Sequence, residues 1–201
     1  MIAIPLLFGQ ALALVAGESF NWQWFALIHV FGLLCQIYIL YLNDYADEAL
    51  DRINQSYWLS GGSRVIPEGH LTGQQLYAAS FIALGGLLVL SAVGYTLGRG
   101  WMPALTGLAL VLGWSYSLAP IKASYRGYGE LHQAFSCAVF LPVMGFYLQV
   151  GSLVAFPWAL LLPLVLIFFA ANIITALADA TSDKLGGKQT YPVRHGDARA
   201  R

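Results

Sequence analysis

Long apolar runs recur along this chain and limit what it can fold into. They lie at about residues 1–17, 22–42, 74–98, 101–118, 131–150 and 157–178. A helix of about 20 residues crosses the hydrocarbon core of a bilayer, so runs of this length predict transmembrane helices. A transmembrane barrel would need short alternating segments instead. We therefore predict an all-α, polytopic transmembrane helical bundle with about six spans.

Composition excludes an ordinary soluble domain. The 201 residues are 58% hydrophobic and 10% charged, whereas soluble domains carry about 25% charged residues. Both cysteines, Cys35 and Cys137, lie inside apolar runs, where small packing residues are more common than disulfides or metal ligands. We expect membrane lipid, and no nucleic acid, among the partners.

The charged residues are distributed unevenly along the chain. Three long polar segments, 43–73, 119–130 and 179–201, alternate with short turns, so six spans place all three on one side of the membrane. Nine of the ten Lys and Arg residues lie in these segments, and Arg99 is the exception. By the positive-inside rule the long segments face the cytoplasm. We expect a multi-pass protein of the cell inner membrane with cytoplasmic motif loops.

An acidic cluster follows the second apolar run. Asp44, Asp47 and Asp51 are spaced i, i+3 and i+7, so a helix places their carboxylates on one face. Carboxylates that close together repel one another unless a cation lies between them. The spacing predicts a divalent-metal site, with a solvated acidic helix end as the alternative.

A second acidic cluster ends the sixth apolar run. Asn172, Asp179 and Asp183 are separated by seven and then four residues, which also places them on one stripe of a helix. Two such clusters on the same side of the membrane make stray charges a weaker explanation. Oxygen ligands suit Mg²⁺, which often bridges carboxylates to a phosphate.

Glycines and cations accompany both clusters. The segment Ser60–Arg64 follows the first cluster and Lys184–Thr190 follows the second. Glycine permits close approach of the backbone to an anion. The segment Tyr116–Glu130 adds Lys122 and Arg126 to the same face. For any single residue an ordinary loop is the alternative, but together these segments predict a bound diphosphate–Mg²⁺ complex.

These motifs together resemble the UbiA superfamily of intramembrane aromatic prenyltransferases. The sequence Asn43-Asp44-x-x-Asp47-x-x-x-Asp51 is similar to the first Asp-rich motif of that family. Asp179-x-x-x-Asp183, followed by Gly187-Lys188-x-Thr190, is similar to the second. The segment Tyr116–Glu130 resembles the cytoplasmic loop between them. Because the resemblance covers nearly the whole chain, we expect a single domain over residues 1–201.

The resemblance implies transfer of a polyprenyl group from its diphosphate to an acceptor, often an aromatic ring, with Mg²⁺ as cofactor. The partners it implies are a polyprenyl diphosphate and an aromatic acceptor. It assigns the metal to carboxylates of both motifs, namely Asp44, Asp47, Asp51, Asp179 and Asp183. It assigns the diphosphate to cations, namely Arg64, Lys122, Arg126 and Lys188. It assigns catalytic positioning of substrate to Asn43, Tyr116 and Asn172.

Two segments indicate a branch of the family. Ser60–Arg64 and Lys188–Arg194 are most similar to the naphthoate branch, which makes menaquinone. The hydroxybenzoate branch usually has a more basic stretch where this chain has Ile53–Leu59. Transfer to 4-hydroxybenzoate, or another transfer of the UbiA type, stays open.

Other readings remain at this point. Family members usually have about nine transmembrane helices and a polar lead-in, so we expect a chain truncated at both ends, and an inactive membrane fragment stays open. Phosphatidyl transfer would need an Asp-Gly followed by Ala-Arg between its aspartates, which neither cluster has. A cation-coupled transporter would place carboxylates near the bilayer midplane, whereas these acids lie at span ends.

Overall fold

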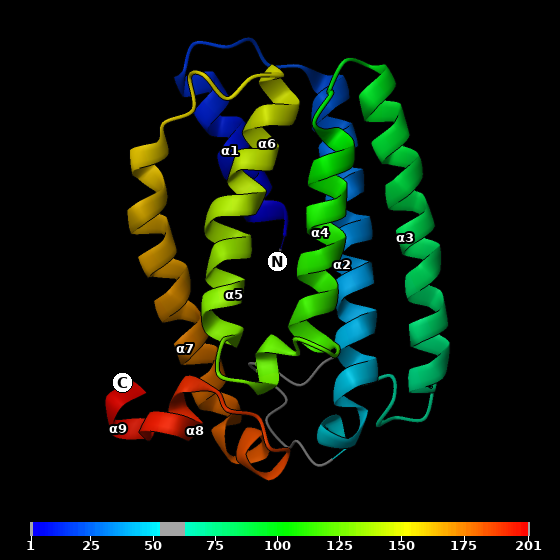
Figure 1. Cartoon of the computed structure of the whole chain (residues 1–201), viewed down its shortest axis with the longest axis vertical. Helices are drawn as coiled ribbons and strands as arrows, with labels where there is room; N and C mark the ends of the chain where they lie inside the picture. The colour runs from blue at the N-terminus through cyan, green and yellow to red at the C-terminus, as the bar shows by residue number, and fades with distance from the viewer. Residues whose placement is uncertain (1, 53–62, 201) are drawn as a thin grey trace.

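The computed structural model describes residues 2–52 and 63–200, and no β-strand occurs in these two ranges. The bundle helices lie side by side along a common direction (Figure 1). They are α1 (Ala3–Val15), α2 (Trp22–Asp51), α3 (Gly73–Thr96), α4 (Met102–Ser117), α5 (Gly129–Phe135), α6 (Leu141–Val150) and α7 (Leu161–Leu185). Short α8 (Tyr191–His195) and α9 (Asp197–Ala200) follow. One-turn 3-10 helices occupy Ala123–Tyr125 and Trp158–Leu160, and a π-helical segment, Ser136–Phe140, joins α5 to α6.

Local sequence explains where two of the long helices begin. The Asn21 side chain accepts hydrogen bonds from the backbone N–H groups of Gln23 and Trp24, which caps α2. Thr72 and Gln75 form a reciprocal capping box at the start of α3. Both caps satisfy backbone donors that have no partner within the helix.

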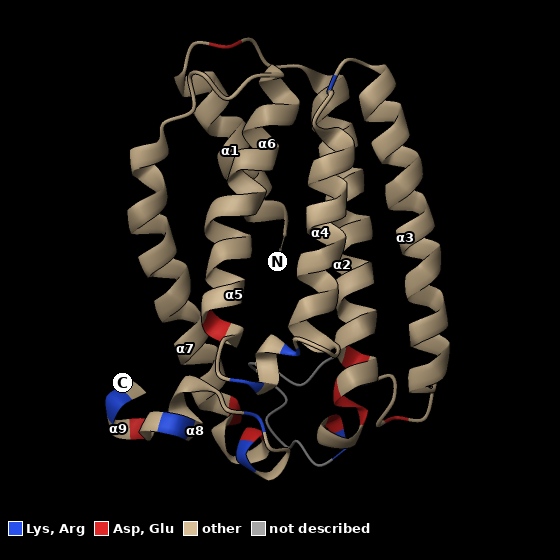
Figure 2. Ribbon diagram, in the orientation of Figure 1, with Lys and Arg blue, Asp and Glu red and all other residues tan. Residues whose placement is uncertain are grey.

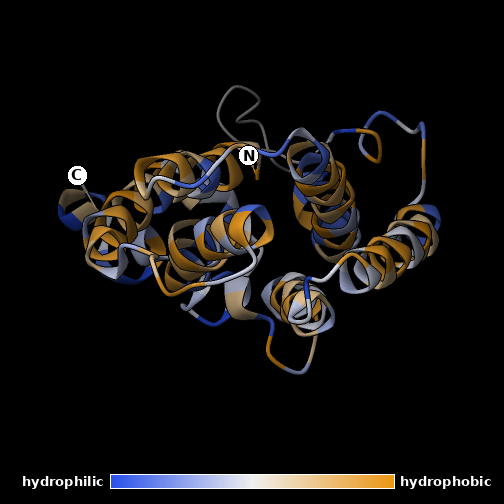
Figure 3. Ribbon diagram, turned by 90° about the horizontal axis from the view of Figure 1, so that it is seen from above, coloured by the Kyte–Doolittle hydropathy of each residue, from blue (hydrophilic) through white to orange (hydrophobic). Residues whose placement is uncertain are grey.

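The fold is that of an integral membrane protein with a bundle of apolar helices. Four helical segments are long and apolar enough to cross a bilayer: α2, α3, Gly129–Val150 and Trp158–Leu185. Helices α1 and α4 run beside them and are shorter, with 13 and 16 residues. Seen along the bundle, the helices are largely hydrophobic (Figure 3). The most apolar window of Trp158–Leu185 has a mean hydropathy of 2.5 and no buried residue.

The charged residues gather at one end of the bundle (Figure 2). Helices α2 and α7 reach this end and continue past the expected span ends at 42 and 178, to Asp51 and Leu185. A 30-residue helix is about 45 Å long, against about 30 Å for the hydrocarbon core. The acidic clusters therefore occupy the last helical turns, where backbone geometry fixes their spacing.

Arg99, the cation of the opposite end, has a structural role. Its guanidinium donates to the carbonyl oxygens of Leu148 (2.8 Å) and Gln149 (3.1 Å), near the end of α6. It also stacks on the Trp24 ring at 4.2 Å. Cations near a helix C-terminus interact favourably with its last carbonyls, so Arg99 ties α6 to α2.

Helices α1 and α6 cross so closely that two glycines are required. A Cβ on Gly9 would collide with the Pro142 carbonyl, and one on Gly145 with the Leu6 carbonyl. Small residues let helix backbones approach in this way. We expect Gly9→Ala to lower the stability of the detergent-solubilised protein by about 1–3 kcal/mol, the usual cost of overpacking.

The matched control for this prediction is Gly85→Ala, because a Cβ there meets open space and alanine favours the helix. Thermal unfolding should show a lower midpoint for Gly9→Ala alone. Equal midpoints for the two variants would contradict the close α1–α6 crossing.

Candidate active site

The Asp residues of α2 lie in its last turns, at the charged end of the bundle. Asp44 and Asp47 are 1% and 4% exposed, and Asp51, one turn further on, is partly buried. Burying a carboxylate is costly unless it is paired or hydrogen-bonded. The partners of each carboxylate therefore define the site.

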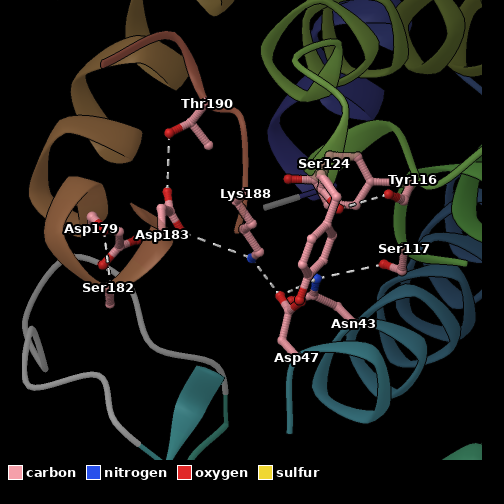
Figure 4. Close-up of polar contacts among 11 residues, drawn as sticks. Asn43, Asp47, Tyr116, Ser117, Ser124, Asp179, Ser182, Asp183, Lys188 and Thr190 are labelled. Atoms are coloured by element: carbon pink, nitrogen blue, oxygen red, sulfur yellow. Dashed lines mark hydrogen bonds and ion pairs between the residues drawn. The ribbon is translucent and has the colours of Figure 1, made fainter. Parts of the chain in front are cut away.

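Asp47 is held from three sides. Its Oδ1 accepts a hydrogen bond from the Tyr125 hydroxyl at 2.7 Å. Its Oδ2 accepts from Lys188 Nζ at 2.7 Å and from Asn43 Nδ2 at 3.1 Å. The Asn43 amide also lies 3.5 Å from Ser117 Oγ, at the end of α4. Asp47 thereby joins α2 to the loop after α4 and to the segment after α7 (Figure 4).

Lys188 lies between the two acidic clusters (Figure 4). Its Nζ is 4.0 Å from Asp183 Oδ1 as well as 2.7 Å from Asp47 Oδ2, and its side chain is 13% exposed. Asp183 is 5% exposed and also accepts from Thr190 Oγ1 at 3.3 Å. Asp179, one turn earlier on α7, is partly buried. One ammonium group thus compensates a carboxylate from each cluster.

Asp44 differs from Asp47 because one of its oxygens lacks a donor. Oδ2 accepts from both the backbone N–H (3.3 Å) and the hydroxyl of Ser63. Oδ1 is buried, and no hydrogen-bond partner for it occurs among the described residues. An unsatisfied buried acceptor is costly, so this oxygen is a position where a cation fits.

The donor set matches Mg²⁺ in chemistry, since all five predicted ligands are carboxylates. Within residues 2–52 and 63–200, however, no three His, Cys, Asp or Glu side chains are arranged to hold one metal ion. The ammonium of Lys188 lies between Asp47 and Asp183 instead. The metal assignment of the five aspartates stays a prediction.

Tyr125 connects two of the predicted cations. Lys122 Nζ lies 3.6 Å from the centre of its ring and Lys188 Nζ lies 5.3 Å from it, in cation–π geometry. Burial, and then the charge of Asp47, raise the pKa of the Tyr125 phenol well above its usual range. The phenol therefore stays protonated and donates its hydrogen bond to Asp47.

The four predicted diphosphate cations do not all converge. Lys122 and Lys188 meet at the Tyr125 ring. Arg64 forms an ion pair with Glu68 at 3.5 Å, and Arg126 is exposed. Residues 60–62 of the predicted glycine turn lie outside the described part of the chain. Arg64 and Lys122 both have left-handed backbone conformations, with φ of 62° and 48°, which are uncommon for non-glycine residues and often found at functional positions.

A cavity of about 350 Å³ opens between α2, α4, the α5–α6 segment and α7. Tyr116 and Asn172, two of the predicted positioning residues, line it. Asn43, the third, contacts Asp47 instead. Tyr116 is adjacent in sequence to Ser117, which contacts Asn43, so the cavity adjoins the carboxylate site.

The sequence model of the UbiA prenyltransferase family matches residues 2–201. The chain belongs to this family. A 1,4-dihydroxy-2-naphthoate octaprenyltransferase of Escherichia coli is 30% identical over an alignment of 219 positions, gaps included, which covers 98% of this chain and 67% of that protein. A Bacillus subtilis protein of the same name is 25% identical over 123 residues, which cover 61% of this chain and 38% of that protein. The chain thus spans 38% and 67% of the lengths of these two curated relatives.

Solved structures of UbiA homologues have the same fold. The homologue from Archaeoglobus fulgidus, solved with DMAPP and Mg²⁺ bound, superposes with a TM-score of 0.73 at 19% identity, covering 99% of this chain and 68% of that one. The apo homologue from Aeropyrum pernix gives a TM-score of 0.73 at 17% identity, covering 99% and 71%. These likenesses confirm the all-α membrane bundle.

The UbiA motifs of this chain are supported by residues that sequence reasoning did not assign. Side-chain hydroxyls donate hydrogen bonds to three of the carboxylates: Ser63 to Asp44, Tyr125 to Asp47 and Thr190 to Asp183. Glu130 is 7% exposed, and its Oε1 accepts the backbone N–H of Tyr191, the first residue of α8, at 2.6 Å. An acid placed at a helix N-terminus stabilises it. No local pattern could have found this contact, because the two residues are 61 positions apart.

Proposed function

We propose that this UbiA-family chain transfers a polyprenyl group from its diphosphate to an aromatic acceptor within the membrane. One observation carries the proposal: acidic clusters on α2 and α7 meet at Lys188, beside a membrane-embedded cavity lined by Tyr116 and Asn172. The diphosphate needs the charged site, and the allylic carbon and the aromatic ring that react need an apolar space beside it.

Aspartates of both clusters would hold Mg²⁺ in this proposal, namely Asp44, Asp47, Asp51, Asp179 and Asp183. The unsatisfied Oδ1 of Asp44 supports this assignment. Mg²⁺ bound there would stabilise the negative charge of the departing diphosphate.

The residues of the chain have complementary roles. Lys122 and Lys188, which meet at Tyr125, bind the diphosphate, and Arg64 and Arg126 are further candidates. Asn43 orients Asp47. The carbon–oxygen bond to the diphosphate breaks with its electron pair leaving on the diphosphate. A ring carbon of the acceptor then forms the new carbon–carbon bond, and the ring loses a proton or, at a carboxylated carbon, carbon dioxide.

The cavity is less favourable to water than the carboxylate site. Its wall is mostly apolar, and the Tyr116 ring belongs to it. An allylic cation is stabilised by aromatic faces and is quenched by water. Asn172 donates a weak hydrogen bond of 3.5 Å to the Glu130 carbonyl, so it helps keep α7 against α5 at the edge of the cavity.

We further propose 1,4-dihydroxy-2-naphthoate as the acceptor, and hence a role in menaquinone biosynthesis. The names of the two curated relatives support this choice. The distribution of Lys and Arg supports a place in the inner membrane with the carboxylate site facing the cytoplasm.

Prenyl transfer by the purified chain in detergent tests the function. The protein is incubated with Mg²⁺ and a polyprenyl diphosphate, with either 1,4-dihydroxy-2-naphthoate or 4-hydroxybenzoate. We expect prenylated naphthoate, and no product when Mg²⁺ is chelated. Product from 4-hydroxybenzoate alone would overturn the acceptor. If neither product forms but Mg²⁺-dependent diphosphate binding remains, transfer by this chain is refuted and the binding site is retained.

We expect Glu130→Ala to weaken Mg²⁺-dependent binding of a prenyl diphosphate by about tenfold. The substitution removes the acceptor for the Tyr191 N–H, and a hydrogen bond to a charged group contributes about 1.5–3 kcal/mol. Lys188 lies three residues before Tyr191, so its segment loses an anchor. Isothermal titration is the measurement. Glu130→Gln keeps an acceptor oxygen and should lose less, and equal losses in both variants would contradict this anchoring role.

A further inference from the structure

A strip of uncharged polar residues lines one wall of the cavity. His132, Gln133 and Ser136 lie in the membrane-spanning segment Gly129–Val150 and face the cavity. No Asp, Glu, Lys or Arg occurs among the described residues that line it. Polar groups in the apolar part of a membrane are costly and tend to mark functional positions. We therefore expect the ligand of this cavity to carry hydrogen-bonding groups.

The backbone of this segment helps to present the strip. In an α-helix, residues four apart drift by about 40° around the axis. The π-helical turn Ser136–Phe140 contains more residues per turn and so reduces that drift. Phe140, at the end of this turn, therefore faces the same cavity as His132 and Ser136. Single π-helical turns occur frequently at functional sites.

His132 is fixed where the cavity meets the carboxylate site. Its Nε2 lies 3.0 Å from Ser115 Oγ, and its ring centre lies 5.6 Å from that of Tyr116. Tyr116 in turn precedes Ser117, a neighbour of Asn43. A prenyl diphosphate bound at the carboxylates would place its reacting carbon at this end of the cavity. The acceptor ring must reach the same point, because the two carbons form a bond.

We propose that His132, with Gln133 and Ser136, is the specificity-determining wall that binds the hydroxyl groups of the aromatic acceptor. The inference rests on the proposed function and deepens it, since it names the chemical class that the cavity selects: a hydroxylated ring, recognised by uncharged hydrogen-bonding groups. The cavity volume of 350 Å³ is at the lower end of the about 300–1,000 Å³ usual for ligand sites. A cavity of this volume suits a small aromatic ring system such as the acceptor.

Equilibrium binding to the full chain in detergent tests the proposal without turnover. Two probes are compared under reducing conditions, 1,4-dihydroxy-2-naphthoate and naphthalene-2-carboxylate, which lacks both hydroxyls. Mg²⁺ and a prenyl thiodiphosphate, which resists ionisation, are present. The parent protein should bind the hydroxylated probe at least about tenfold more tightly.

The decisive variant is His132→Phe, which keeps an aromatic ring and removes both nitrogens. We expect it to lose the tenfold preference while binding naphthalene-2-carboxylate as the parent does. His29→Phe is the matched control, because His29 is also a membrane-embedded histidine but contacts Gln10 and lies outside the cavity lining. His132→Asn, which retains hydrogen-bonding groups, should restore part of the preference.

Three results would overturn the proposal: no preference in the parent, an unchanged preference in His132→Phe, or an equal loss for both probes, which would indicate a purely structural role. Mg²⁺-dependent binding of the thiodiphosphate is measured separately in every variant. If the parent does not bind the thiodiphosphate, the proposed function is refuted. The preference for the hydroxylated probe tests only the role of His132, Gln133 and Ser136.

Discussion

Replacing Asp44 or Asp183 with alanine should abolish Mg²⁺-dependent binding of a prenyl diphosphate while leaving the protein inserted in the membrane. Both carboxylates are buried, and one oxygen of Asp44 has no donor among the described residues. We expect the loss of affinity to exceed about 100-fold, because removing even an outer partner of a metal ligand costs 10- to 100-fold. This affinity is measured by isothermal titration of each protein with a prenyl thiodiphosphate in the presence of Mg²⁺.

Asp197→Ala is the control, since Asp197 is an exposed acid of α9, a helix at the same end of the bundle. It should bind as the parent does. Asp44→Asn keeps an oxygen that can accept from Ser63, so it separates loss of charge from loss of packing. If Asp44→Ala and Asp183→Ala both bind the diphosphate normally, the carboxylates are not the site.

Replacing Lys188 with methionine should destabilise the metal-free protein and make it unusually responsive to Mg²⁺. The ammonium lies between Asp47 and Asp183, which are 6% and 7% exposed in their side chains. Removing one partner of a buried ion pair costs about 3–5 kcal/mol, because the remaining charges are uncompensated. A divalent cation supplies the missing charge. Thermal unfolding with and without Mg²⁺ should show a lower midpoint without the ion and a larger rise with it.

Two variants control this experiment. Lys184→Met removes an exposed lysine near the end of α7 and should change neither midpoint. Lys188→Arg keeps the charge and should resemble the parent in the absence of metal. A Lys188→Met protein with the parent's midpoint and the parent's response to Mg²⁺ would show that Lys188 does not compensate the two clusters.

These experiments separate two contributions of Lys188. In the structure described, it is the cation that both clusters share, while the proposed function uses it to bind the diphosphate. Both can hold if the ammonium leaves Asp47 when Mg²⁺ binds and turns to the diphosphate. The thermal experiment reports the first contribution and diphosphate affinity reports the second.

The sequence by itself determined the membrane bundle, the family and the residues that gather at one end. Hydrophobic length and helical spacing are local properties, so the motif on α2 and the motif on α7 were each readable along a single helix. Helices α1 and α4 are shorter than the apolar runs that predicted them, with 13 and 16 residues. Helices α2 and α7 continue past the predicted span ends at 42 and 178, because polarity, and not helix formation, changes there.

Only the tertiary structure decided which groups meet. It placed Lys188 between Asp47 and Asp183. It also brought Ser63 within hydrogen-bond distance of Asp44, and Tyr191 within hydrogen-bond distance of Glu130. It also turned His132, Gln133 and Ser136 toward one cavity. These arrangements depend on the packing of residues that are far apart in the chain or lie on different helices. Helical periodicity fixes which residues share a face, but the packing of one helix against another decides what that face touches.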